Sequence, residues 1–140
     1  MAILLLSLCG GCGSSGGSGV TPKYKDNGNG TITDSAGLMW QKQDDAVART
    51  WDAATTYCSG LGLAGLSGWR LPALTELQSL IVMTSLPRID ATYFPSTQQN
   101  YYWSSTTHET LTTRAWLVSF QTGASDHFDK TNSFFVRCVR

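Results

Sequence analysis

The chain has 140 residues, and its ten basic and ten acidic side chains give a formal net charge of zero at pH 7. The basic residues are scattered along the chain, so nucleic acid is not an expected partner. Five Trp, five Tyr and five Phe, combined with a low content of charge, indicate a folded domain rather than a disordered one. About 120 residues remain beyond the N-terminal segment, enough for one domain with a substantial core.

Residues 1–12 are typical of a lipoprotein-type signal segment. The apolar run Ile3–Leu8 is shorter than the roughly 20 residues that a membrane-spanning helix needs. It leads into Cys-Gly-Gly-Cys at residues 9–12, and small residues before a cysteine suit the cleavage point of a bacterial lipoprotein. Cys12 fits this pattern better than Cys9, which directly follows a bulky leucine. We therefore expect lipidation at Cys12.

Residues 13–20 are predicted to form a Gly/Ser tether. Such a run has few side chains to pack, so it behaves as a flexible linker. This argues against the alternative that residues 1–12 form a buried apolar strand. A multiply acylated cysteine followed by a tether would display a domain away from a membrane. The predicted location is the bacterial cell envelope, with a lipid anchor at the outer membrane or exposed to the surface or periplasm.

The folded domain, residues 21–140, is predicted to begin with a β-hairpin. Two Asn-Gly steps at residues 27–30 are a strong signal for a tight turn. Strand-like residues follow the turn, and the chain continues into the strand Leu38–Gln41. The acidic spacing also resembles a calcium loop. Glycines, however, occupy the places of the second and third oxygen ligands, so a turn is the preferred interpretation.

Two short helices are predicted next. Thr50 can cap the first through its hydroxyl group, and Asp52 suits the positive end of the helix dipole. Gly60 or Gly62 would end this helix. Its expected buried stripe, at helical spacing, is Trp51, Ala54, Cys58 and Leu61. The second helix follows residues 68–72, and the apolar residues expected on one face are Leu74, Leu77, Leu80 and Ile81.

Aromatic and β-branched runs predict three strands in the last third of the chain, at residues 101–106, 115–120 and 134–139. The helices come early and most of the strands late. This order predicts an α+β fold with two short helices and a mostly antiparallel sheet.

The candidate functional residues lie in or beside two predicted loops, residues 106–114 and 121–132. Both loops are rich in Thr, Ser, Asp, His and Asn, which provide adaptable hydrogen bonds on a rigid scaffold. The five tryptophans are expected mainly in the core, with Trp103 and Trp116 as the exceptions. The candidate ligand-binding residues are Trp103, His108, Arg114, Trp116, Asp126, His127, Asp129 and Lys130.

A metal or catalytic site is the alternative use of the same loops. If the loops meet, His108 and Glu109 could join the Asp126–Asp129 segment to bind a divalent metal or act as acid and base. Solvated histidines are ordinary in polar loops, so we predict no metal, no cofactor and no catalysis.

Several motifs are specific in combination: Asp26–Asp34, Gly37–Trp40, Gly68–Pro72, Glu76–Leu77, Tyr102–Thr106 and Phe135–Arg140. Together they resemble the bacterial Lcl C-terminal domain family, a domain of unknown function that includes the C-terminal domain of a collagen-like adhesin. The resemblance covers nearly all of residues 21–140 and implies a C-type-lectin-like fold. In such folds the first helix is joined to the last strand by a disulfide, which implies a bond between Cys58 and Cys138. An oxidising compartment also favours a disulfide over a metal or redox pair.

Some features linked to this resemblance are missing from the chain. It lacks the Glu-Pro-Asn, Gln-Pro-Asp and Trp-Asn-Asp motifs of calcium-dependent sugar binding, and it lacks the Lys and Arg clusters that sulfated polysaccharides require. Ala73 stands where family members often have Thr or Ser pairing with Glu76 in a capping box. This change should cost about 1 kcal/mol of local stability.

The sequence therefore predicts an extracytoplasmic lipoprotein with a non-catalytic, adhesin-like recognition domain. The expected partners are a protein or glycan ligand at the cell surface, and the membrane through the lipid anchor. One alternative is a structural envelope protein that packs against a partner or itself. The other is a divergent metal-dependent enzyme that uses His108, His127 and nearby carboxylates.

Overall fold

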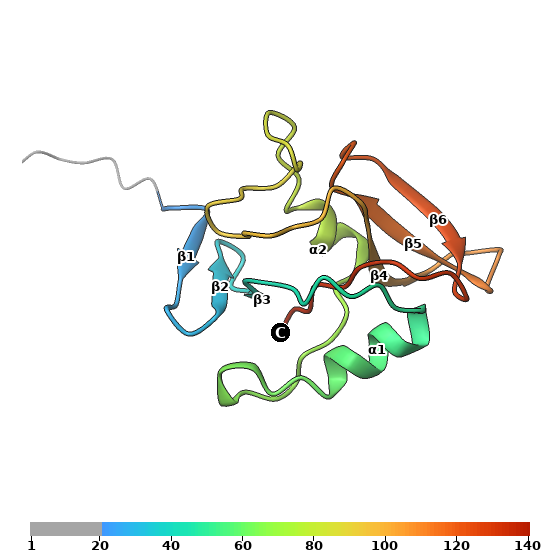
Figure 1. Ribbon diagram of the computed structural model, residues 1–140, viewed down its shortest axis with the longest axis horizontal. Helices are drawn as coiled ribbons and strands as arrows, with labels where there is room; N and C mark the ends of the chain where they lie inside the picture. Colours follow the sequence, from blue (N-terminus) through green and yellow to red (C-terminus); the bar gives the residue numbers. More distant parts are fainter. Residues whose placement is uncertain (1–20) are drawn as a thin grey trace, which may run out of the picture.

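The computed structural model describes residues 21–140; the predicted signal segment, the tether and the lipidation at Cys12 lie outside the described residues. Two three-stranded antiparallel sheets and two short α-helices make up the described chain (Figure 1). The α+β prediction is confirmed. No helix within residues 21–140 is long and apolar enough to cross a membrane.

The N-terminal sheet contains β1 (Tyr24–Asp26), β2 (Thr31–Asp34) and β3 (Met39–Gln41) in that order. The predicted hairpin is confirmed, and its turn needs Gly28 and Gly30, whose φ angles are +74° and +86°. The carboxylate of Asp26 accepts a hydrogen bond from the Gly28 N–H at 2.9 Å and pairs with Lys42 at 2.6 Å. One carboxylate oxygen of Asp26 therefore stabilises the turn, and the other forms an ion pair.

The C-terminal sheet contains β4 (Tyr101–Thr107), β5 (Arg114–Ser119) and β6 (Ser125–Asp129), again in chain order. β6 lies inside the segment 121–132 that was predicted to be a loop, so that prediction was wrong in part. Every β6 side chain is half-buried, and Phe128 is its one large apolar residue. The strand forms through backbone pairing with β5, which leaves little hydrophobic pattern to detect.

The two helices are α1 (Trp51–Ser59) and α2 (Leu74–Gln78). Thr50 caps α1 as predicted, since its hydroxyl accepts a hydrogen bond from the Ala53 N–H at 3.4 Å, and Gly60 ends the helix. At α2, the Ala73 N–H donates to the Glu76 carboxylate at 2.7 Å.

A neighbouring strand supplies a hydrogen bond at the start of α2. The Thr106 hydroxyl in β4 accepts a hydrogen bond from the Leu74 N–H at 3.0 Å. This contact satisfies one of the free N–H groups in the first turn of α2. The contact adds stability at the start of α2, but the N–H groups that a Thr or Ser at position 73 would cap are those of Thr75 and Glu76.

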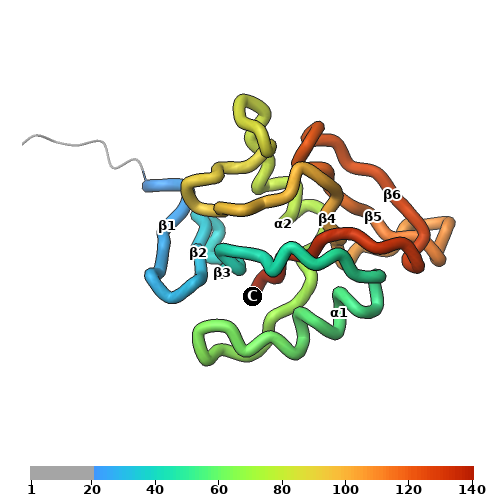
Figure 2. The backbone as a smooth tube through the Cα atoms, viewed as in Figure 1, coloured from blue at the N-terminus to red at the C-terminus, as the bar shows by residue number. Residues whose placement is uncertain are grey.

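The predicted last strand, residues 134–139, is not a continuous strand. It forms single bridges with four separate segments: Phe134 with Arg49, Phe135 with Tyr102, and Val139 with both Trp40 and Arg70. Figure 2 shows this C-terminal stretch running across the middle of the molecule, past β4 and towards β3. It passes between the two sheets and forms only one bridge with each segment that it meets, so no regular β-ladder develops.

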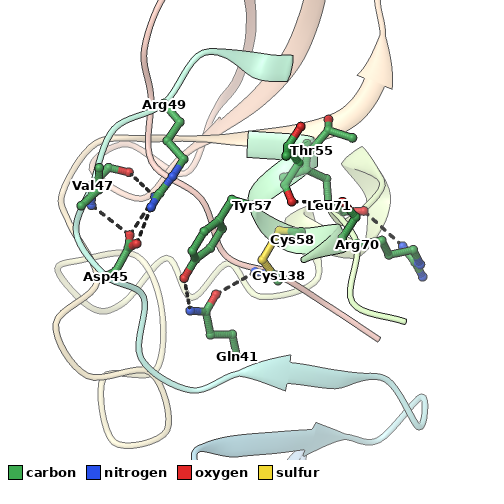
Figure 3. The surroundings of a disulfide bond; sticks show 12 residues. Gln41, Asp45, Val47, Arg49, Thr55, Tyr57, Cys58, Arg70, Leu71 and Cys138 are labelled. Atoms are coloured by element: carbon green, nitrogen blue, oxygen red, sulfur yellow. Dashed lines mark hydrogen bonds and ion pairs between the residues drawn. A yellow bond between two sulfur atoms is a disulfide. The ribbon is translucent and has the colours of Figure 1, made fainter. Parts of the chain in front are cut away.

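A disulfide joins Cys58 in α1 to Cys138, as the resemblance implied, with a Cα–Cα distance of 5.5 Å. Both cysteines are fully buried. Figure 3 shows the bond beside Gln41, which accepts from the Cys138 N–H and donates to the Tyr57 hydroxyl, each at 3.1 Å. The bond closes a loop of 80 residues, which the chain-entropy model values at roughly 4–5 kcal/mol.

The core consists of two clusters. One packs the N-terminal sheet and α2 against the irregular segment 79–100, with Trp40, Phe94 and Tyr102 fully buried. The other lies beneath α1 and contains the disulfide, Trp69 and Trp103. Three of the five tryptophans are thus core residues, whereas Trp51 and Trp116 are partly exposed.

Candidate functional site

The C-terminal sheet brings most of the predicted candidates together. Arg114 pairs with Asp129, and Trp116 with His127, between β5 and β6. Directly opposed residues of an antiparallel pair lie on the same face of the sheet. His108, which follows β4, adds a third aromatic ring beside Trp116. The two predicted segments therefore do meet. We call His108, Trp116 and His127 the Trp116 cluster.

The three rings of the Trp116 cluster are in mutual contact. The imidazole of His108 stacks on the indole of Trp116, with ring centroids 5.4 Å apart and planes 19° apart. The ring of His127 lies 4.2 Å from that of His108 and meets Trp116 in a T-shaped arrangement at 5.1 Å. Trp116 and His127 lie in paired strands and His108 directly follows a third, so the cluster is held by the backbone ladder.

The tautomer of His108 follows from its hydrogen bonds. Its Nδ1 accepts from the backbone N–H groups of Leu111 and Thr110, at 3.1 and 3.3 Å. The neutral ring therefore carries its proton on Nε2. The Glu109 carboxylate lies 3.8 Å from the same Nδ1 and is 70% exposed. A hydrogen bond from its own backbone N–H lowers the pKa of Glu109, with smaller contributions from the charges of His108 and His127 and from the Trp116 N–H, which lies near the carboxylate without forming a hydrogen bond to it.

Two polar atoms of the Trp116 cluster are buried without a hydrogen-bond partner among residues 21–140: Nε1 of Trp116 and Nδ1 of His127. An unpaired buried donor or acceptor costs about 1–3 kcal/mol, so such atoms are normally paired. An indole N–H can only donate. The cluster therefore has unused hydrogen-bonding capacity beside aromatic surface.

The remaining predicted residues divide between the two faces of the sheet. Arg114 pairs with Asp129 at 3.3 Å next to the Trp116 cluster, and both side chains are well exposed. Asp126 is paired with buried Leu117, which points it away from the cluster. Lys130 donates to the Thr107 hydroxyl at 3.0 Å, and its ammonium group lies 4.2 Å from the ring centroid of Trp51.

Trp103 does not belong to any exposed site. Its side chain is fully buried, and its indole N–H donates to the Arg49 carbonyl at 2.8 Å. Trp103 was among the predicted ligand-binding residues, and the structure places its side chain in the core beneath α1. Among residues 21–140, no group of three or more His, Cys, Asp or Glu side chains is arranged to hold a metal ion.

The structure also contains a cavity that sequence analysis missed. It measures about 220 Å³ and lies between α1 and residues 69–71, lined by Trp51, Thr55, Ser59, Trp69, Arg70, Leu71 and Ser105. Three of these residues lie along one side of α1 at four-residue spacing. A polar stripe next to a tryptophan was the available signal, but both cavity tryptophans had been assigned to the core.

Among known protein families, one family model matches this chain. Residues 30–140 match the Lcl C-terminal domain. The match spans both helices, the whole C-terminal sheet and all the residues that line the cavity, and it leaves out β1. No curated protein matches the chain.

Proposed function

Because this chain belongs to the Lcl C-terminal domain family, we propose that it is the ligand-recognition domain of an extracytoplasmic lipoprotein, non-catalytic and C-type-lectin-like in fold. The ligand is a glycan or a protein at the cell surface, and the domain binds it as an adhesin would. The disulfide between α1 and the C-terminal segment supports both the fold and an oxidising compartment.

One observation carries the recognition proposal: the unpaired Trp116 N–H and His127 Nδ1 within a cluster of aromatic rings. Aromatic surface combined with a few convergent polar groups is typical of binding sites. The ligand would stack against the rings, and movement of the exposed Glu109 side chain would open the buried indole N–H to an acceptor on the ligand. The neighbouring Arg114–Asp129 pair supplies polar groups at the edge of the same face.

Display at the envelope is the second part of the proposal. Lipid on Cys12 would hold the chain at a membrane, and residues 13–20 would separate the domain from it. Replacing Cys12 with serine should release the protein from the membrane fraction. Continued retention of that variant would point to a different anchor.

A glycan array tests recognition directly. The protein carrying Cys12→Ser is applied at physiological salt, with calcium and again with chelator. Trp116→Phe keeps an aromatic ring but removes the N–H donor, so binding should weaken about tenfold, the equivalent of about 1.4 kcal/mol. Thr112→Val, at an exposed position between β4 and β5, is the matched control and should bind normally.

The possible outcomes separate the alternatives. Binding that requires Trp116 supports glycan recognition at the cluster, and dependence on calcium would contradict the absence of calcium-binding motifs. A blank array from folded, disulfide-bonded protein would eliminate the glycan ligand and favour a protein ligand or a structural envelope role.

A further inference from the structure

The cavity between α1 and residues 69–71 is separate from the Trp116 cluster. In β5, Ala115 and Leu117 pack against the buried residues of α1, whereas Val118 packs against Leu77 of α2. Side chains alternate between the two faces along a strand, so Trp116 lies on the face opposite α1. The cavity and the cluster therefore lie on opposite sides of the C-terminal sheet.

The walls of the cavity are aromatic and apolar. The indole N–H of Trp51 donates to the Ser104 carbonyl at 2.9 Å, and that of Trp69 donates to the Leu66 carbonyl at 3.1 Å. Both donors are used inside the protein, so the indoles present only carbon surface to the cavity. Leu71 adds a third apolar side chain.

Hydroxyl groups on α1 supply hydrogen-bond acceptors. The Thr55 hydroxyl donates to the Trp51 carbonyl and the Ser59 hydroxyl donates to the Thr56 carbonyl, both at 3.0 Å. Because each proton is already used, these hydroxyls on cavity-lining residues can act only as acceptors towards a ligand. Ser105 contributes a third hydroxyl from β4.

Arg70 supplies the donors. Its guanidinium group has five N–H bonds, of which three donate to the Leu71 carbonyl and the two carboxylate oxygens of Glu76. Two N–H bonds remain, and the pairing with Glu76 neutralises the charge. Figure 3 shows Arg70 and Thr55 on neighbouring segments, with Leu71 close to both.

We propose that this cavity binds a single uncharged sugar ring, as the terminal unit of a glycan. A pyranose has an apolar C–H face that suits indole surface, and a rim of hydroxyls that both donate and accept hydrogen bonds. The cavity provides both kinds of partner, and the one charged side chain that lines it, Arg70, is already paired with Glu76. This site goes beyond the recognition assigned to the Trp116 cluster and does not depend on it.

Fluorescence titration of the full chain carrying Cys12→Ser tests the proposal, because two tryptophans line the cavity. The probes are methyl glycosides of glucose, galactose, mannose and N-acetylglucosamine, with glucuronic acid and indole as comparators. We expect saturable binding of at least one neutral glycoside, at least tenfold weaker binding of glucuronic acid, and no displacement by equimolar indole.

Thr55→Tyr fills the cavity from α1 and should weaken glycoside binding at least tenfold. Thr56→Tyr is the matched control: Thr56 is also exposed and its hydroxyl also donates to a helix carbonyl at 3.0 Å, but it does not line the cavity. Ser105→Leu fills the cavity from β4 and provides a second test if Thr55→Tyr proves unstable.

Glycoside binding that is lost in Trp116→Phe but kept in Thr55→Tyr would place the sugar at the Trp116 cluster and overturn the proposal. The proposal is overturned if no neutral glycoside binds, if both tyrosine variants bind equally well, or if indole displaces the sugar. Preferential binding of indole would identify an apolar ligand instead.

Discussion

Arg137 is fully buried, and replacing it with methionine should be among the most damaging single substitutions in the domain. Its Nη2 donates to Thr97 at 2.8 Å and pairs with the buried Asp44 carboxylate at 3.2 Å. Its Nη1 donates to the carbonyls of Gln41 and Lys42, at 2.6 and 2.7 Å. Burial lowers the pKa of Arg137, and the Asp44 carboxylate opposes this effect.

The size of the loss follows from what Arg137→Met leaves behind. The Asp44 side chain is only 1% exposed and would become an unpaired buried charge. Removing one partner of such a pair costs about 3–5 kcal/mol. A domain of this size has a total stability of about 5–15 kcal/mol, so the variant loses a large part of it. Arg137→Lys keeps the charge but cannot reach four acceptors, so it should also destabilise.

Urea unfolding followed by tryptophan fluorescence measures this loss, with the disulfide kept intact. The double variant Arg137→Met with Asp44→Asn leaves no charge buried, so it should be more stable than Arg137→Met with Asp44 unchanged. A double-mutant cycle then gives the coupling energy of the pair. A loss below about 1 kcal/mol for Arg137→Met, or purely additive effects, would refute the reasoning.

Three further tests concern the disulfide, the buried Tyr24 hydroxyl and the hydrogen bond that caps α2. Replacing both Cys58 and Cys138 with serine should cost about 4–5 kcal/mol in urea unfolding, and reduced wild-type protein should match it; a much smaller loss would mean that the unfolded chain is already restricted. Burial raises the pKa of Tyr24 from 10.0 to about 12, and its hydroxyl has no partner among residues 21–140. Stability should therefore fall between pH 10 and 12, as the unfolded state loses a proton that the folded state keeps, and Tyr24→Phe should reduce this fall without loss at pH 7. Thr106→Val removes the acceptor for the Leu74 N–H and should cost about 1 kcal/mol, whereas an unchanged urea midpoint would show that another group caps α2.

Some parts of the fold could be predicted because their signals are local. Thr50, Asp52 and Gly60 define the limits of α1 and all lie in the helix or directly beside it in the sequence. The hairpin turn similarly depends on its own glycines. β6 lacks such a signal, and residues 134–139 carry a strand-like apolar run without forming a continuous strand, because the conformation of both depends on pairing with distant segments.

In the candidate site too, the sequence indicated which residues matter but not where they lie in the fold. The sequence identified His108 and His127 as residues that could bind a ligand or a metal. Whether their rings come into contact depends on the strand register that pairs Trp116 with His127. Arg137 was counted among scattered basic residues, because its partner Asp44 lies 93 positions away. A lone arginine within a strand-like run does not reveal that it is buried.

The two candidate sites depend on different parts of the fold, and this difference can be measured. Cys138 holds α1 through the disulfide, and α1 forms one wall of the cavity. The Trp116 cluster depends instead on the ladder of β4, β5 and β6, which contains no cysteine. Mild reduction below the unfolding transition should therefore weaken glycoside binding at the cavity, while ligand binding at the cluster is retained. Equal loss at both sites would show that the disulfide stabilises the whole domain as one cooperative unit, and that α1 does not loosen separately.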